Sequence, residues 1–161
     1  MGSIRRGVTP VGTALQTRYT VQQHPPAGSR HYRYEKGEPL DDRACTPGAI
    51  SPPVTQGGPG VDDLLNGRLH QEHPPSESVT RKEKQLNGAS YAYKGSLGDA
   101  EYDHLFSHQL GSDPNDARNL WVEPADPGHK PGSGVNNLKV PVETKLHTVA
   151  CSGKVTLTAA R

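Results

Sequence analysis

The sequence predicts a small, loop-rich α+β domain that follows a low-order N-terminal tail. Only 31% of the 161 residues are hydrophobic, and the chain has one Phe and one Trp. Its 18 Gly and 15 Pro make up a fifth of the chain, against roughly 12% in average proteins. Because burial of apolar surface is the main term opposing chain entropy, we do not expect all residues to pack as one globule. The C-terminal half, in contrast, has a strand, loop, strand, helix pattern.

Composition and charge exclude several classes. No run of about eighteen apolar residues is present, so neither a transmembrane helix nor a membrane partner is expected. No apolar segment follows Arg5 and Arg6, so no secretory signal is visible and the default compartment is the cytoplasm. The formal net charge of +1 provides no global basic field. Cys45 and Cys151 form no metal-binding pair, and the sequence leaves open whether they form a disulfide or stay unrelated thiols.

Residues 1–44 are expected to form the tail, because Gly and Pro recur there without hydrophobic periodicity. Within this segment, residues 30–34 interleave basic and aromatic side chains (RHYRY). Such a patch can stack on single-stranded nucleic acid, and a solvated loop is the alternative interpretation.

Residues 45–161 are expected to form the domain. Polar and apolar residues alternate over 102–106 and predict a strand, and 119–122 resembles a second strand that includes Trp121, a core anchor. Val142, Leu146 and Val149 recur at helical spacing and predict a helix over 140–149, with Pro141 in a first turn that tolerates proline. The further expected elements are a helical turn over 62–69, a helix over 80–86, an edge strand over 91–93 and a helix beginning at 156.

The sharpest local feature is the pair Asp103-His104. An acidic residue beside a histidine can supply one metal ligand and one general base, which metal-assisted phosphodiester hydrolysis requires. Adjacent side chains on a strand point to opposite faces, so a shared site needs a bent strand end. His108 lies four residues after His104, but on a segment expected to be strand and loop, so we expect a solvated side chain there.

The stretch YDHLFSHQLGS, followed by a short loop and ARNLWVEP, resembles the HNH (ββα-metal) endonuclease motif. It is similar in particular to an actinobacterial branch with the pattern DHLIPLELGG…PRNLWPEP. Weaker matches extend the resemblance over residues 45–161. It implies a ββα-metal fold and a DNA endonuclease, and it leaves the first 44 residues unexplained.

The resemblance implies a role for each matching residue. His104 matches the general base that activates water, and Asn119 matches the central Asn that orients this base. Asp103 matches an acidic metal ligand, and the last ligand falls at Asn137, with Asn136 as the alternative. These oxygens suit one Mg²⁺ or Mn²⁺ ion better than zinc. The expected phosphate contacts are Arg118 and Lys139, and the expected partner is nucleic acid, DNA rather than RNA.

The sequence also departs from the family pattern. Ser107, His108 and Gln109 replace a Pro-Leu-Glu run, and Val140 replaces an acidic residue. Because a carboxylate is lost near the metal loop, the alternative hypothesis is a catalytically weak or inactive nucleic-acid-binding protein of the same fold. A third hypothesis is an exported nuclease, which a disulfide between the two cysteines would favour.

Overall fold

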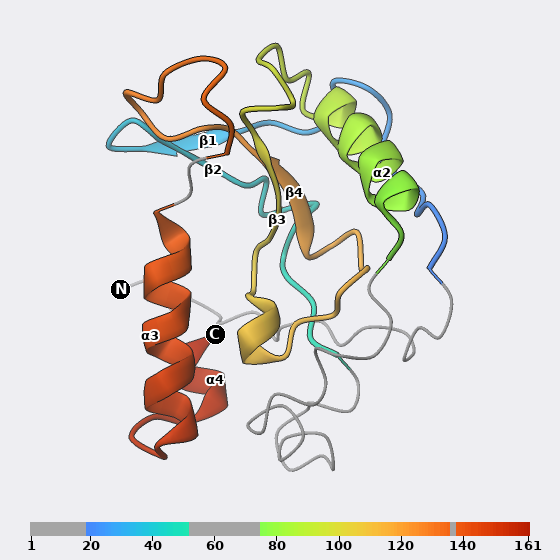
Figure 1. Cartoon of the computed structure of the whole chain (residues 1–161). Helices are drawn as coiled ribbons and strands as arrows, with labels where there is room; N and C mark the ends of the chain where they lie inside the picture. The colour runs from blue at the N-terminus through green and yellow to red at the C-terminus, as the bar shows by residue number, and fades with distance from the viewer. Residues whose placement is uncertain (1–18, 52–74, 136–137) are drawn as a thin grey trace, which may run out of the picture.

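Two small antiparallel sheets and three helices form a mixed α/β arrangement in the described part of the protein. The computed structural model describes residues 19–51, 75–135 and 138–161. α2 and α3 lie on opposite sides of the β3–β4 pair (Figure 1). The elements in chain order are β1 (Arg33–Glu35), β2 (Glu38–Leu40), α2 (Glu77–Ser90), β3 (Glu101–His104), the 3₁₀-helix η2 (His108–Leu110), β4 (Leu120–Glu123), α3 (Lys139–Cys151) and α4 (Leu157–Ala160).

β3 and β4 form the antiparallel pair at the centre of the fold, with Asp103 opposite Trp121 and His104 opposite Leu120. Leu120, Trp121 and Val122 of β4 are all buried, and α2 packs against this strand. Trp121 is therefore the core residue that the sequence predicts. The strands and the helix α3 follow one another in the expected order.

A small apolar cluster joins α3 and α4 to η2. It consists of Leu110, Ala150 and Ala160, with Leu146 and Leu157 packed against them. Leu146 is thus one of the periodic residues that predict this helix, and it contacts the interior as expected. The cluster is small because Ala contributes little apolar area.

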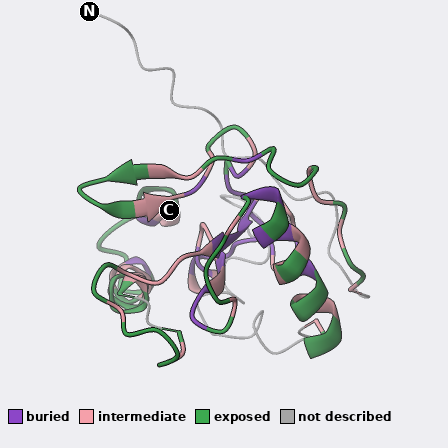
Figure 2. Ribbon diagram, turned by 90° about the horizontal axis from the view of Figure 1, so that it is seen from above, coloured by how far each residue is buried: buried purple, intermediate pink, exposed green. Residues whose placement is uncertain are grey.

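The interior contains more polar than apolar residues. Among the described residues, ten hydrophobic and fourteen polar or charged residues are buried. They gather around the strands and on the inner face of α2 (Figure 2). Buried polar groups are stable when hydrogen-bonded. Asn87 is an example, since its Nδ2 donates to Leu120 O at 3.0 Å and its Oδ1 accepts from Val122 N at 2.8 Å.

The expectation of a low-order tail through residue 44 is wrong for residues 19–44. Gly28 N donates to Ala89 O and Arg30 N to Ser90 O, both at 2.9 Å, which satisfies carbonyls at the C-terminal end of α2. Tyr32 stacks on Tyr91 and donates its hydroxyl proton to the β4 backbone. These contacts need no aliphatic periodicity, so the sequence pattern did not indicate them. Residues 1–18 lie outside the described residues.

The same segment contains the β1–β2 hairpin, which the sequence analysis missed. Lys36 and Gly37 connect the strands, and both have positive φ, at 52° and 90°. A two-residue turn of this kind matches the right-handed twist of an antiparallel pair. Pro39 in β2 is compatible with a strand at a sheet edge, where no N–H is needed for pairing.

Other local expectations had mixed outcomes. The helices over 80–86 and 140–149 are confirmed, each with longer bounds, and the helix after 156 is confirmed as α4. The edge strand over 91–93 is wrong, because Tyr91 and Ala92 form the turn that ends α2. The helical turn over 62–69 lies outside the described residues. Among the helices described, none is long and apolar enough to cross a bilayer.

Replacing Asn87 tests the polar link between α2 and β4. Asn87→Ala leaves one buried N–H and one buried C=O of β4 without partners, and each costs about 1–3 kcal/mol. We expect the free energy of unfolding to fall by about 2–4 kcal/mol in urea denaturation. Gln85→Ala, on the exposed face of the same helix, should change it by less than about 0.5 kcal/mol. Equal effects of the two substitutions would contradict the role given to Asn87.

Candidate functional site

The candidate site is built around His104, the last residue of β3. Just beyond it, Leu105 N still donates to Asn119 O at 2.7 Å, and then the chain leaves the sheet. Ser107 begins η2 with its side chain as the cap, and Gly111, with φ of 78°, ends it. This short helix folds the connecting loop back onto the end of the strand.

Asn119 holds the two ends of that loop together. Its buried side chain accepts from Phe106 N at 3.0 Å and donates to Phe106 O at 3.2 Å and to Asp113 O at 3.4 Å. It also accepts from Ala49 N at 3.4 Å. Asn119 therefore joins the backbone just after His104 to the backbone just before Pro114. The role of Asn119 in orienting His104 stays a prediction.

The His104 ring has a defined hydrogen-bonding state. Its Nε2 lies 3.0 Å from Pro114 O and 2.8 Å from Nε2 of His108. Because a carbonyl can only accept, we assign the proton to Nε2 of His104, and the ring lone pair to Nδ1. Burial lowers the pKa of His104 below its ordinary value, so the ring is neutral at pH 7.

His108 does not behave as the solvated side chain expected from the sequence. Its ring packs edge-on against His104, with the ring centroids 3.9 Å apart. The spacing of four residues brings the two rings together because η2 reverses the chain direction. The sequence analysis missed this pairing because it expected no helical turn at His108.

Asp103 is held by a cation from α3. Its Oδ2 accepts from Lys139 Nζ at 2.5 Å and from the Trp121 indole N–H at 3.2 Å. Lys139 Nζ also donates to His104 O at 2.6 Å and lies 3.2 Å from a Glu143 oxygen. Burial alone would lower the pKa of Lys139, but Asp103, and then Glu143, hold it above its ordinary value. The Lys139 ammonium is therefore charged and fixed between the strand and the helix.

Glu123 belongs to the same cluster, and its carboxyl has the most strongly shifted pKa of the acids there. Burial, and then the neighbouring Asp103 charge, raise the pKa of Glu123 to about 8. At pH 7 its carboxyl is therefore mostly protonated and hydrogen-bonded to Asp103. The sequence analysis missed Glu123 and Glu143. The available signals were the i, i+4 spacing of Glu143 from Lys139 and the strand face that Glu123 occupies.

The residues described around Asp103 do not fit a divalent ion in this arrangement. The Lys139 ammonium already contacts Asp103 Oδ2, so an ion at that oxygen would have to displace it. In the described ranges, no three His, Cys, Asp or Glu residues are grouped so that they can hold a metal. Asn137 and its alternative Asn136 lie outside the described residues, so the predicted second ligand stays a prediction.

The two predicted phosphate contacts are both engaged with acids. Lys139 is only partly exposed, and its ammonium is paired with Asp103 and Glu143. Arg118 donates through Nε and Nη2 to the Asp116 carboxylate, at 2.9 and 2.5 Å, while 40% of its side chain stays exposed. The structure therefore places Arg118, but not Lys139, where a ligand has substantial access.

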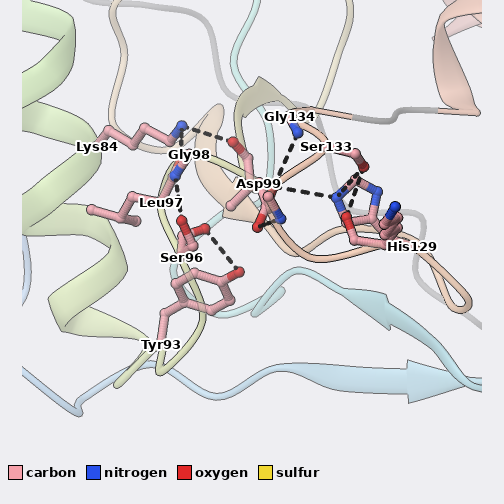
Figure 3. A network of polar contacts seen from close by, with 12 residues as sticks. Lys84, Tyr93, Ser96, Leu97, Gly98, Asp99, His129, Ser133 and Gly134 are labelled. Carbon is pink, nitrogen blue, oxygen red and sulfur yellow. Dashed lines mark hydrogen bonds and ion pairs between the residues drawn. The ribbon is translucent and has the colours of Figure 1, made fainter.

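A second cluster combines Ser133, His129 and Asp99 (Figure 3). Ser133 Oγ and Asp99 Oδ1 both approach the same ring nitrogen of His129, at 3.3 and 3.4 Å. A Ser-His-Asp triad needs them on opposite ring nitrogens, so this cluster is not a nucleophilic site. Asp99 instead accepts from Gly132 N and Gly134 N and fixes the loop that leads to α3.

A groove of about 630 Å³ opens next to the end of β3. Leu105 and Phe106, which directly follow His104, form part of its wall. Three arginines also line it, together with the acidic residues Glu35 and Asp41. The arginines are Arg33, Arg43 and Arg161.

Both cysteines are free thiols in this structure. Cys45 is half-buried and Cys151 is exposed, with its sulfur 3.3 Å from Nε2 of His147. No disulfide is therefore available to support the hypothesis of an exported nuclease.

Comparison with protein-family models, curated proteins and solved structures finds no match for this chain. The resemblance to HNH endonucleases therefore stays a prediction that rests on the motif residues.

Glu123→Gln tests the protonation of the acidic cluster. A carboxyl with a pKa of about 8 in the fold and about 4.5 when unfolded stabilises the protein most below pH 4.5. This stabilisation is lost as pH rises through 8. Gln imitates the protonated acid at all pH values. Between pH 5 and pH 8, wild type should therefore lose about 3–4 kcal/mol more unfolding free energy than Glu123→Gln.

Urea denaturation of both proteins at the two pH values measures this difference. Other groups that titrate between these pH values contribute equally to both proteins, so their effect cancels in the comparison. Glu35→Gln, at an exposed position of β1, is the control and should show the pH dependence of wild type. Parallel curves for wild type and Glu123→Gln would show that Glu123 is ionised in the fold.

Proposed function

We propose that this chain is an endonuclease that hydrolyses phosphodiester bonds in DNA, with His104 as the general base. The observation that carries the proposal is the state of His104. A neutral ring is held at the end of β3 by Pro114 O, and its lone pair on Nδ1 can accept a proton. A general base that works near pH 7 must be unprotonated and fixed in position.

The surrounding residues position this base. Asn119 fixes the backbone at Phe106 and Asp113, and so it sets the place of the neighbouring Pro114 carbonyl. In the proposed reaction, Nδ1 of His104 takes a proton from the attacking water. The oxygen of this water then attacks the phosphorus, and the bond to the leaving oxygen breaks.

The arginine-lined groove supports a nucleic-acid substrate. Guanidinium groups pair with phosphate oxygens in bidentate geometry, and Phe106 offers an aromatic surface for a base. Arg43 is exposed at this groove. Arg118, partly exposed on the loop between β3 and β4, is a further candidate for contact with the phosphate backbone.

The metal-dependent form of this proposal places one Mg²⁺ or Mn²⁺ on Asp103 and Asn137. It requires Lys139 to leave Asp103, and the steps given above do not depend on it. An ion bound there would supply Lewis-acid stabilisation of the phosphate charge.

The second candidate function is a non-catalytic nucleic-acid-binding protein. The pairing of Asp103 with Lys139 favours it, because an internal ammonium then occupies the carboxylate that the family motif assigns to metal. A binding protein needs the groove but not the lone pair of His104.

Plasmid nicking distinguishes the two functions. We expect wild type to convert supercoiled plasmid to open circles, and His104→Ala to be slower by about 10²–10⁴-fold because the base is lost. His104→Gln, which keeps a polar side chain, should be equally slow. His147→Ala, whose ring contacts Cys151 near the end of α3, should retain the wild-type rate, and circular dichroism checks that each variant folds.

Two outcomes would contradict the endonuclease proposal. One is cleavage that is unchanged in both His104 variants. The other is an absence of cleavage with and without EDTA or added Mn²⁺, with a mobility shift of DNA retained, which would favour the binding protein. Loss of nicking in EDTA, together with its restoration by Mn²⁺, would assign the metal-dependent form.

A further inference from the structure

The contact between His104 and His108 is close enough for a shared proton. The two Nε2 atoms are 2.8 Å apart, and the rings meet edge-on at 83°. Both side chains are partly buried, one at the end of β3 and the other at the start of η2. Ser107 caps η2 and fixes the position from which His108 reaches back.

The Pro114 carbonyl determines which ring donates. It requires a hydrogen on Nε2 of His104, and this leaves Nε2 of His108 as the acceptor in the contact between the rings. The hydrogen on Nε2 of His104 thus lies between a carbonyl, which cannot take up a proton, and an imidazole nitrogen, which can.

We propose that His108 is a positioning residue for His104 and receives its Nε2 proton during the reaction. When Nδ1 of His104 takes a proton from the attacking water, the N–H bond at Nε2 breaks and the proton bonds to Nε2 of His108. His104 ends neutral with its hydrogen on Nδ1, and His108 ends as an imidazolium. This inference rests on the proposed function, since it requires His104 to act as a base.

The charges around His104 explain why such a transfer is useful. Burial opposes a positive ring most, the hydrogen bond to Pro114 O and then Asp103 on β3 favour it, and Lys139 on α3 opposes it. Lys139 is bonded to the carbonyl of His104 itself, at 2.6 Å. A positive charge confined to His104 is therefore unfavourable, and the transfer moves it to the ring of His108.

The test compares the rate of plasmid nicking, as a function of pH, in wild type and three variants. His108→Ala should lower kcat by about 10- to 100-fold with little change in KM, and shift the acidic limb of the profile. His108→Gln can still accept the hydrogen bond but cannot take up the proton, so it should be as slow as His108→Ala. His147→Ala, whose ring contacts Cys151 near the end of α3, is the matched histidine control and should follow wild type.

Two kinetic results would overturn the proposal. The first is a wild-type rate and pH profile in His108→Ala. The second is full recovery of the rate in His108→Gln, which would mean that His108 only holds the ring and takes no proton.

Histidine side-chain NMR separates this proposal from the proposed function. In wild type, the ¹⁵N shifts should show a hydrogen on Nε2 of His104, and the two rings should titrate as a coupled pair. In His108→Ala, the titration midpoint of His104 should fall, because the acceptor for its Nε2 hydrogen is lost. Independent titration of the two rings in wild type would overturn the pairing, even if the protein cleaves DNA. Coupled titration without any cleavage would retain the pairing and reject only the endonuclease.

Discussion

The ammonium of Lys139 fixes α3 to the central strands. It donates to the Asp103 carboxylate and to the His104 carbonyl, so the first residue of the helix is tied to the last two residues of β3. Burial, and then the neighbouring Asp103 carboxylate, raise the pKa of Glu123, so Glu123 retains its proton at pH 7. One ion pair thus sets the position of the helix and the charge of the cluster next to the candidate base.

Other buried side chains also join parts of the fold that are distant in sequence. Asn87 joins α2 to β4, Asn119 closes the loop between the central strands, and Asp99 fixes the loop that precedes α3. Each is a buried polar side chain that bonds to backbone groups distant in sequence. In a chain with few large apolar residues, such links supply the specificity that a larger hydrophobic core would otherwise provide.

The sequence predicted the elements with a clear pattern and missed those formed by individual contacts. Alternation and helical spacing located β3, β4 and α3, and Trp121 was correctly placed in the core. The packing of residues 19–44 depends on hydrogen bonds to the end of α2 and on the stacking of Tyr32, which have no periodic signature. For the site, Asp103, His104 and Asn119 came from the motif, whereas the partners His108 and Glu123 depend on a turn and on strand register.

The ion pair between Lys139 and Asp103 is the central contact of the site, and the single Trp of the chain reports on it. The Trp121 indole N–H lies 3.2 Å from Asp103 Oδ2, so paramagnetic Mn²⁺ bound to that carboxylate would broaden its NMR signal. We predict that the indole signal of wild type stays sharp when equimolar Mn²⁺ is added. Loss of this signal at equimolar Mn²⁺ in wild type, with recovery in EDTA and with a sharp signal retained in Asp103→Asn, would place the ion on Asp103 and contradict the pairing with Lys139.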